Sequence, residues 1–409
     1  MQSSIKAGGL LLLFIAPVSG HAVDMVGASP SAASAFNPEI ALILSGAYAH
    51  LSEDPAKYAI TGFVPGGEIG PGSRGFNLAE SELGIYANID PFLYGGINVA
   101  LAPDDTVAVE EAFIQTTGLG HGATLKAGRY FSAIGYLNDK HAHTWDFVDN
   151  PLAYQAFLGT QYKDEGVQLK WLAPTQGYLE LGAEAGRGTN FPAAARDKNG
   201  AGAVAVFAHV GGDVGASHSW LAGVSYLKVT PQDREYTGMD VVGQTVTNAF
   251  SGASRLWIAD FLWKWAPNGN FTTRNFKLQG EYFSRREDGV LAYDTSTPPR
   301  SLGPVSSAYA SQQSGWYVQG LYQFMPRWRV GLRSDGLDSG TQELSRNRAN
   351  LLATDYRPAR TSVVLERSFS EFSRVRVQWA RDRSRMDVAD NQIFIQYQAS
   401  LGAHGAHKF

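Results

Sequence analysis

The feature that most constrains this chain is the alternation of apolar and mainly polar side chains in its last stretch, residues 392–409. Ile393 and Tyr397 fall on one face of this stretch, and Gln392 and Gln398 fall on the other. A period of two predicts a β-strand, here with one face for an apolar medium and one for water. The rest of the chain must supply the partners of this strand.

The N-terminus predicts export. Lys6 precedes an apolar run over residues 10–18, and residues 20–22 have the small-x-small form that a signal peptidase recognises. We therefore expect a signal peptide over residues 1–22 and a periplasmic lead-in over residues 23–37. After residue 22 no apolar run approaches the roughly 18 residues that a membrane helix needs, so strands would have to cross any bilayer.

Composition excludes several classes of protein. The chain has 409 residues and no cysteine, which excludes a disulfide scaffold and cysteine metal sites. Its formal net charge of −4 gives no basic footprint for nucleic acid, so we expect no such partner. The 45 glycines among abundant aromatic residues are typical of strands and turns.

The remaining residues, 38–409, predict an all-β fold, a transmembrane antiparallel β-barrel of about 16 strands. Long and short connections alternate between the strands, as between the outer loops and periplasmic turns of such barrels, and an even strand number returns both termini to one side. The alternating or apolar runs lie near residues 40–50, 78–89, 93–102, 107–117, 123–130, 165–171, 177–186, 203–211, 218–228, 256–266, 275–286, 315–325, 328–335, 360–368, 373–383 and 392–401.

Charged residues on the polar parity of these runs predict a water-filled interior. Trp257 and Phe261 lie on the parity opposite to Asp260, and Tyr282 lies opposite to Glu281. Because a soluble sandwich would turn its apolar face inward and rarely has so many strands, we interpret the apolar face as lipid-facing. The candidate lumen-wall residues are Arg329, Arg333, Arg374, Arg376, Glu281 and Asp260.

Residues 110–114 (Glu-Glu-Ala-Phe-Ile) and 125–131 (Leu-Lys-Ala-Gly-Arg-Tyr-Phe), followed by a long loop, resemble a passage of the phosphate-selective porin O/P superfamily. Residues 36–409 are also similar to a group of uncharacterised outer-membrane proteins that are often labelled zinc-regulated or TonB-dependent receptors. The resemblance implies an outer-membrane location in a Gram-negative bacterium and strands in contact with the lipid bilayer. It also implies recognition of the terminal Phe409 by the barrel-assembly machinery, and a homotrimer by analogy.

The resemblance also implies that the loop at residues 131–164 folds into the lumen and narrows it. The candidate constriction residues of this loop are Asp139, Lys140, Asp146, Asp149 and Asp164. Their excess of negative charge would favour cations. The alternative is that the carboxylates face solvent or form ion pairs with arginines of the wall.

His141 and His143 lie in the same loop with carboxylates nearby. Alternate residues of an extended segment point the same way, so the two imidazoles are candidate zinc ligands. The alternative is ordinary hydrogen bonding within the loop. We expect no other cofactor.

Three functions follow from these observations. The leading hypothesis is a channel for passive diffusion of small hydrophilic solutes or ions, since about 16 strands leave an aqueous lumen. The second is an outer-membrane receptor or transporter for a divalent metal. The third is an outer-membrane hydrolase that uses the inward-facing His209, but no catalytic motif is present and we assign no catalytic residue.

Overall fold

The computed structural model describes residues 38–67, 69–102, 106–194 and 197–402, so the expected signal peptide (1–22), the lead-in (23–37) and Phe409 lie outside the described residues. The short helices are η1 (Pro55–Lys57), η2 (Ala142–Thr144), α1 (Leu152–Leu158), η3 (Pro267–Gly269) and η4 (Ser345–Ala349). Among the described residues, no helix is long and apolar enough to cross a membrane. The strands are β1 (Glu39–Leu51), β2 (Gly75–Leu78), β3 (Ser81–Asn88), β4 (Leu93–Leu101), β5 (Val107–Thr116), β6 (Ala123–Phe131), β7 (Lys163–Leu172), β8 (Tyr178–Gly186), β9 (Ala203–Val214), β10 (His218–Val229), β11 (Arg234–Met239), β12 (Thr245–Trp265), β13 (Asn275–Tyr293), β14 (Val305–Met325), β15 (Trp328–Glu343), β16 (Ala359–Ser370), β17 (Ser373–Arg383) and β18 (Asp390–Gly402).

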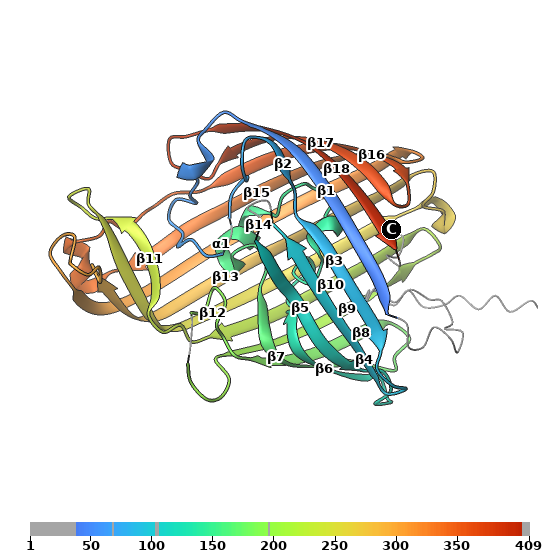
Figure 1. The fold of residues 1–409 in the computed structure, drawn as a ribbon, viewed down its shortest axis with the longest axis horizontal. Helices are drawn as coiled ribbons and strands as arrows, with labels where there is room; N and C mark the ends of the chain where they lie inside the picture. The colour runs from blue at the N-terminus through green and yellow to red at the C-terminus, as the bar shows by residue number, and fades with distance from the viewer. Residues whose placement is uncertain (1–37, 68, 103–105, 195–196, 403–409) are drawn as a thin grey trace, which may run out of the picture.

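All of these strands belong to one closed antiparallel sheet (Figure 1). The ladder closes where β1 pairs with β18, from Ala41 opposite Gly402 to Leu51 opposite Gln392. β2 and β3 pair with successive parts of β1, so together they occupy one position in the wall. β11 pairs only with the first part of β12 and adds no further position. The 18 strands of the sheet therefore form a wall of 16, which confirms the predicted barrel.

The connections alternate as expected. At one end of the barrel lie the start of β1, the end of β18 and short turns such as residues 326–327 between β14 and β15. At the other end lie the long connections, among them residues 132–162 between β6 and β7. Every neighbouring pair of strands can therefore be antiparallel, and the first and last strands meet without a crossover.

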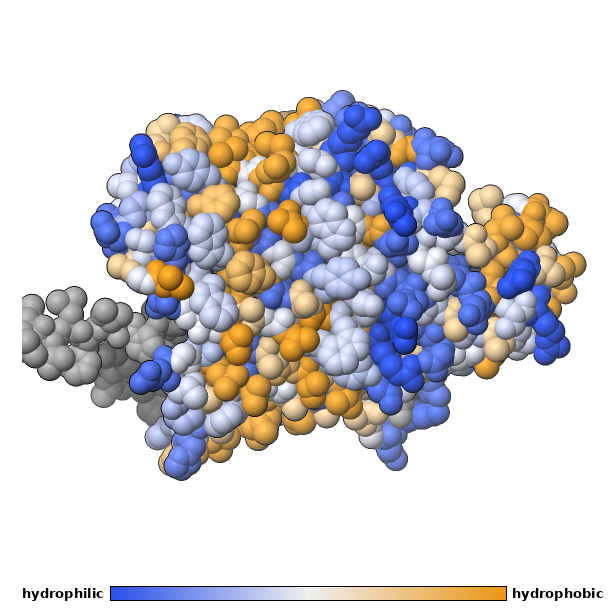
Figure 2. All heavy atoms as spheres, turned by 180° about the vertical axis from the view of Figure 1, so that it is seen from behind, coloured by the Kyte–Doolittle hydropathy of each residue, from blue (hydrophilic) through white to orange (hydrophobic). Residues whose placement is uncertain are grey.

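The two faces of the wall also agree with the sequence pattern. Trp257 and Phe261 on β12 are exposed, whereas Asp260 is buried toward the inside. On β18 the apolar Ile393 and Ile395 are exposed. Figure 2 shows apolar side chains gathered over the middle of the wall and hydrophilic ones gathered toward the outer end, as expected for a band in contact with lipid.

This assignment of faces predicts unequal effects of a new charge at two adjacent positions. Ala259 is exposed in the middle of β12 and Asp260 points inward. Ala259→Arg should lower the free energy of unfolding in lipid by about 2–4 kcal/mol, because it places a charge at the bilayer midplane. The measurement is urea unfolding in vesicles, followed by the migration difference between unheated and boiled samples. An equal effect of Asp260→Arg, which places the same new charge on the lumen side, would contradict the assignment.

Strands β12 to β15 are longer than the sequence predicts. β12 begins at Thr245 rather than near residue 256, and β15 ends at Glu343 rather than near residue 335. These added segments rise beyond the rest of the wall (Figure 1) and carry few alternating apolar residues, since they lie above the lipid-facing band. They form a small core of their own, which contains Val246, Phe250, Leu291, Tyr293, Leu344 and Leu351.

The largest difference from expectation lies inside the barrel. A hydrophobic core occupies the part of the lumen that faces the long connections. It joins the inward faces of wall strands, for example Ile258 and Phe283, to side chains of three connections that enter the barrel. Folded connections thus fill part of the lumen with apolar side chains, because 16 strands enclose enough room for folded loops as well as for water. The connections contribute Ile60, Phe63, Ile134, Leu137, Trp145, Tyr162, Ala193 and all of the apolar residues of α1.

Candidate functional site in the barrel lumen

The connection between β6 and β7, residues 132–162, forms most of the filling and is called the lumen loop below. Its helix α1 lies inside the barrel (Figure 1), and all seven residues of α1 are buried. The ring of Phe157 packs edge-on against Phe63 and stacks on Phe283, with centroids 5.5 and 5.8 Å apart. The helix ends at Gly159, whose φ of 63° is left-handed and favours glycine.

Two carboxylates of the lumen loop meet basic groups of the opposite wall. Asp146 lies 2.8 Å from Nζ of Lys277 and 3.3 Å from Nη1 of Arg329. Asp149 lies 2.7 Å from Nη2 of Arg333 and 2.8 Å from Nη1 of Arg360. Both carboxylates therefore form ion pairs with the wall, which is the alternative that the sequence left open.

Burial alone would raise the pKa of Asp149. The charges of Arg333 and Arg360 outweigh burial and lower the pKa of this carboxyl to about 2. For Asp146, burial is likewise outweighed by Lys277 and Arg329, and its pKa lies below the ordinary value. Both groups are therefore ionised at neutral pH.

Two further wall arginines bind the backbone of the lumen loop rather than its carboxylates. Arg376 donates to the carbonyl oxygen of Phe147 at 3.0 Å, and Arg374 donates to that of Trp145 at 3.2 Å. Arg374 also bonds Glu366 of β16, at 3.1 Å. The arginines predicted on the lumen wall thus hold the middle of the loop, residues 145–149.

Glu281 of β13 binds the first part of the loop. It accepts hydrogen bonds from the backbone N–H groups of Tyr136 and Leu137, both at 3.1 Å. The hydroxyl groups of Tyr154 and Tyr317 donate to the same carboxylate at 2.9 and 2.6 Å. This network places the start of the loop against the inner face of β13.

The other candidate constriction residues lie elsewhere. Asp139 and Lys140 pair with each other at 3.1 Å. Asp164 belongs to strand β7, where it accepts from the Tyr162 hydroxyl at 2.9 Å and from the N–H of Gly188 at 2.7 Å. The structure therefore brings Asp146 and Asp149 into ion pairs with the basic wall, whereas Asp164 is part of the wall strand β7.

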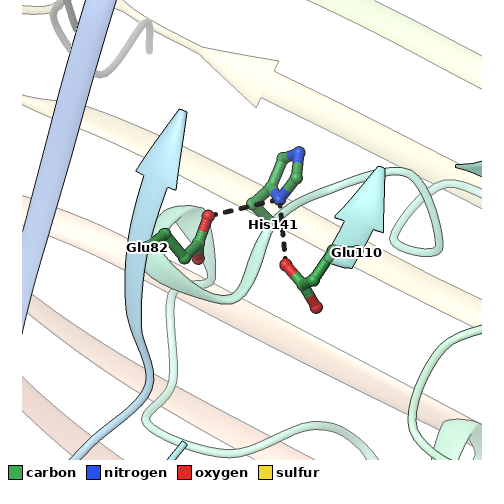
Figure 3. Close-up of side chains that lie close together, drawn as sticks. All are labelled: Glu82, Glu110 and His141. Atoms are coloured by element: carbon green, nitrogen blue, oxygen red, sulfur yellow. Dashed lines mark ion pairs between the residues drawn. The ribbon is translucent and has the colours of Figure 1, made fainter. Parts of the chain in front are cut away.

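His141 and His143 stack with ring centroids 5.7 Å apart, beside the acidic inner faces of β3 and β5. Nδ1 of His143 lies 2.8 Å from Oε1 of Glu82, and Nδ1 of His141 lies 3.3 Å from Oε2 of the same residue. Oε2 of Glu110 lies 3.6 Å from Nδ1 of His141 (Figure 3). Burial lowers the pKa of His141, but the charge of Glu82 and further carboxylate contacts raise it well above the ordinary value.

Four further residues belong to the site without having been predicted as site residues: Glu82, Glu110, Lys277 and Arg360. Lys277 and Arg360 have the inward parity of their strands, so parity was the available signal for them. Nothing in the sequence joins residues 82 and 110 to residue 141, since that contact depends on how the loop folds.

His209, the residue considered for hydrolysis, lies between two carboxylates. Its Nε2 is 3.6 Å from Asp260 and its Nδ1 is 3.9 Å from Glu180. These contacts are those of an ion-pair network across β8, β9 and β12. Neither contact supplies the nucleophile that the hydrolase hypothesis requires.

Comparisons with known proteins give a relative and a set of similar folds. No family model matches the chain. An uncharacterised protein of Aquifex aeolicus is 30% identical over 413 residues, which span 93% of this chain and 82% of that protein. Two solved outer-membrane proteins share the fold at low sequence identity. OmpT of Vibrio cholerae, in its trimer form, is 11% identical with a TM-score of 0.55, over 89% of this chain and 99% of OmpT. The channel DcaP of Acinetobacter baumannii is 10% identical with a TM-score of 0.51, over 89% of this chain and 97% of DcaP.

At such low identities the two solved structures support a shared fold only. The match to the Aquifex relative covers most of this chain and most of that protein. The closed ladder of 16 wall strands agrees with the fold of these two outer-membrane proteins. The chain therefore belongs to one family with the uncharacterised Aquifex aeolicus protein, and its fold is that of the outer-membrane porins.

Proposed function

We propose that the protein is an outer-membrane channel through which small hydrophilic solutes or ions diffuse, and that the lumen loop sets its selectivity. The barrel would be exported by residues 1–22, assembled through Phe409 and held in the lipid bilayer by its apolar band. A homotrimer is part of the proposal, because OmpT of Vibrio cholerae is described in a trimer form.

The observation that carries this proposal is the position of the lumen loop inside a barrel of porin fold. The loop leaves the wall between β6 and β7 and reaches Glu281 of β13 and Arg333 of β15 across the lumen. Any solute that passes must move beside it. Because the core around α1 occupies much of the lumen, we expect a small conductance.

The charges beside the loop would then decide which ions pass. Lys277 and Arg329 retain partial exposure, with 18% and 25% of their side chains accessible, and Asp146 pairs with both. In a confined space these charges act at an effective dielectric value below that of water. A change in their balance should therefore alter ion preference.

Asp146→Asn tests this role. It removes the negative charge but keeps the size of the side chain, so Lys277 and Arg329 are left in excess. We expect the reversal potential in a salt gradient to shift toward anions. The measurement is single-channel recording of the refolded protein in a planar bilayer.

The matched control is Asp338→Asn. Asp338 pairs with Arg357 at 3.4 Å, and the two side chains are 40% and 79% exposed beside an outer connection. This variant should leave the reversal potential unchanged, because water screens charges there. An equal shift in both variants would show that the lumen loop does not set selectivity, and no conductance in native protein would reject the channel itself.

A further inference from the structure

Three wall strands and the lumen loop bring four ligand groups around one point near the inner face of β4. They are carboxylate oxygen Oε2 of Glu82 on β3, Oε2 of Glu110 on β5, Nδ1 of His141 in the loop and the side-chain amide of Asn98 on β4. The three carboxylate and imidazole atoms lie within 4.8 Å of one another. Figure 3 shows both glutamates directed toward the His141 ring.

The distances match the edges of a small coordination polyhedron. Nδ1 of His141 lies 3.3 Å from Glu82, 3.6 Å from Glu110 and 3.1 Å from the amide nitrogen of Asn98, which is 3.2 Å from Glu82. Zn²⁺ binds imidazole and carboxylate at roughly 2.0–2.1 Å, so its tetrahedral ligands are about 3.4 Å apart. One ion can therefore lie between these atoms with little movement of the side chains.

The orientation of Asn98 supports a cation at this point. Asn98 is 3% exposed and, among the described residues, its Oδ1 has no hydrogen-bond partner, while its amide nitrogen faces Nδ1 of His141. A half-turn of the amide exchanges the two atoms at almost no steric cost, since oxygen and nitrogen are nearly the same size. The half-turn would point the unpartnered oxygen into the cluster as a fourth ligand.

A β-bulge explains why two consecutive glutamates face the lumen. Asn98 pairs with Glu111 and the next residue, Val99, pairs with Val109, so Glu110 is an extra residue in β5. In a regular strand Glu110 and Glu111 would point to opposite faces, but both are buried, with 7% and 8% exposure. A bulge re-aims a side chain, and such irregularities are common beside functional sites.

The groups around the four ligands are arranged as an outer shell. Nε2 of His141 lies 3.1 Å from Oε2 of Glu111, and a metal-bound histidine usually donates its other ring N–H to a carboxylate. Oε1 of Glu82 bonds His143, which leaves Oε2 for the ion. Oε1 of Glu110 faces Lys163 at 3.8 Å, which leaves its Oε2 for the ion as well.

We propose that Glu82, Glu110 and His141, with Asn98, bind one divalent transition-metal ion of the Zn²⁺ class, which fixes the lumen loop to the wall at β3–β5. Imidazole together with oxygen ligands at tetrahedral spacing suits this class better than Ca²⁺ or Mg²⁺, which prefer six or more oxygen ligands. His143 and Glu111 then orient the ligands instead of binding the ion. The proposal does not depend on channel activity.

Calorimetric titration of Zn²⁺ into the folded, chelator-treated protein in detergent tests this site. We expect one ion per chain for the native protein. Glu111→Gln should weaken binding about 10–100-fold through loss of the outer carboxylate, and His141→Ala or Glu110→Gln should weaken it further. Bound Co²⁺ should show the intense visible absorption of tetrahedral coordination, and this absorption should be absent in His141→Ala.

The matched control is His50→Ala, since His50 is exposed on the outer face of β1. It should bind Zn²⁺ like the native protein. Each variant is used only if its unheated and boiled samples migrate differently, so that loss of binding cannot arise from loss of the barrel. Equal affinity of native protein and of His141→Ala, or no stoichiometric binding by either, would overturn the site while leaving the channel proposal untouched.

Discussion

Asp149→Ala should lower the free energy of unfolding of the barrel by about 3 kcal/mol, because it removes one partner from a buried ion-pair network. Arg333 and Arg360 are 1% and 3% exposed, and both pair with Asp149. Asp335 stays near both guanidinium groups, so we place the effect at the low end of the range for broken buried pairs. Urea unfolding in detergent or vesicles measures it.

The Asp149 carboxyl should also make the stability of the barrel depend on pH. Its pKa is lowered to about 2 in the folded state, against about 3.9 in an unfolded chain. A lowered pKa stabilises the fold fully above the unfolded value, and this contribution disappears as the pH falls toward about 2. The native protein should therefore lose stability between about pH 4 and pH 2, and Asp149→Ala should lose less over that interval.

Asp338→Ala is the control for the Asp149 variant. The pair of Asp338 and Arg357 is exposed, and surface ion pairs contribute about 0–1 kcal/mol. A similar effect of both alanine variants would mean that water reaches the Asp149 network and that the lumen loop is not held as the structure shows.

The wall of this barrel could be predicted because the bilayer imposes a simple rule on it. Each spanning strand needs one apolar face for lipid, and residues such as Trp257 and Ile395 mark that face directly in the sequence. All 16 predicted runs correspond to wall strands. β11 and the outer parts of β12–β15 were missed because no lipid contacts them there, so the alternation that marks the other strands is absent.

The interior could not be predicted in the same way. Inward positions such as Ile258 and Phe283 break the expected polar parity, because they pack on the lumen loop rather than face water. α1 itself has the sequence Leu-Ala-Tyr-Gln-Ala-Phe-Leu, and an apolar run of seven residues is too short to distinguish a helix from a strand by its period. Only the folded loop shows that these two sets of residues meet.

The candidate site residues could likewise be predicted only in part. The wall arginines were found because charges on the inner parity were expected, and Asp146 and Asp149 because the resemblance implies an inward-folded loop. Which of these groups pair depends on the path of the loop. His141 was found from its spacing to His143, yet the groups nearest to its Nδ1 come from β3, β4 and β5. The bulge that turns Glu110 inward has no signal in the sequence, because a bulge is defined by the register of two strands.

Shortening the lumen loop should raise the single-channel conductance several-fold. Phe131 at the end of β6 pairs directly with Lys163 at the start of β7, so a two-residue Asn-Gly turn could replace residues 133–161 without separating the two strands. The replacement removes α1 and most of the apolar filling from the lumen. Planar-bilayer recording of refolded, heat-modifiable protein measures the change.

The matched control shortens an outer connection of the same geometry. Tyr293 and Val305 also pair across the start of their connection, so a short turn can replace residues 295–303 with the strands kept in register. If the lumen loop obstructs the pore, only its own replacement should raise the conductance, and the cost in stability should also be larger there. That cost arises because the variant exposes Phe283 to water and leaves Arg333 without Asp149. Unchanged conductance in both variants would mean that the two other connections with residues in the core, which contribute Ile60, Phe63 and Ala193, obstruct the pore instead.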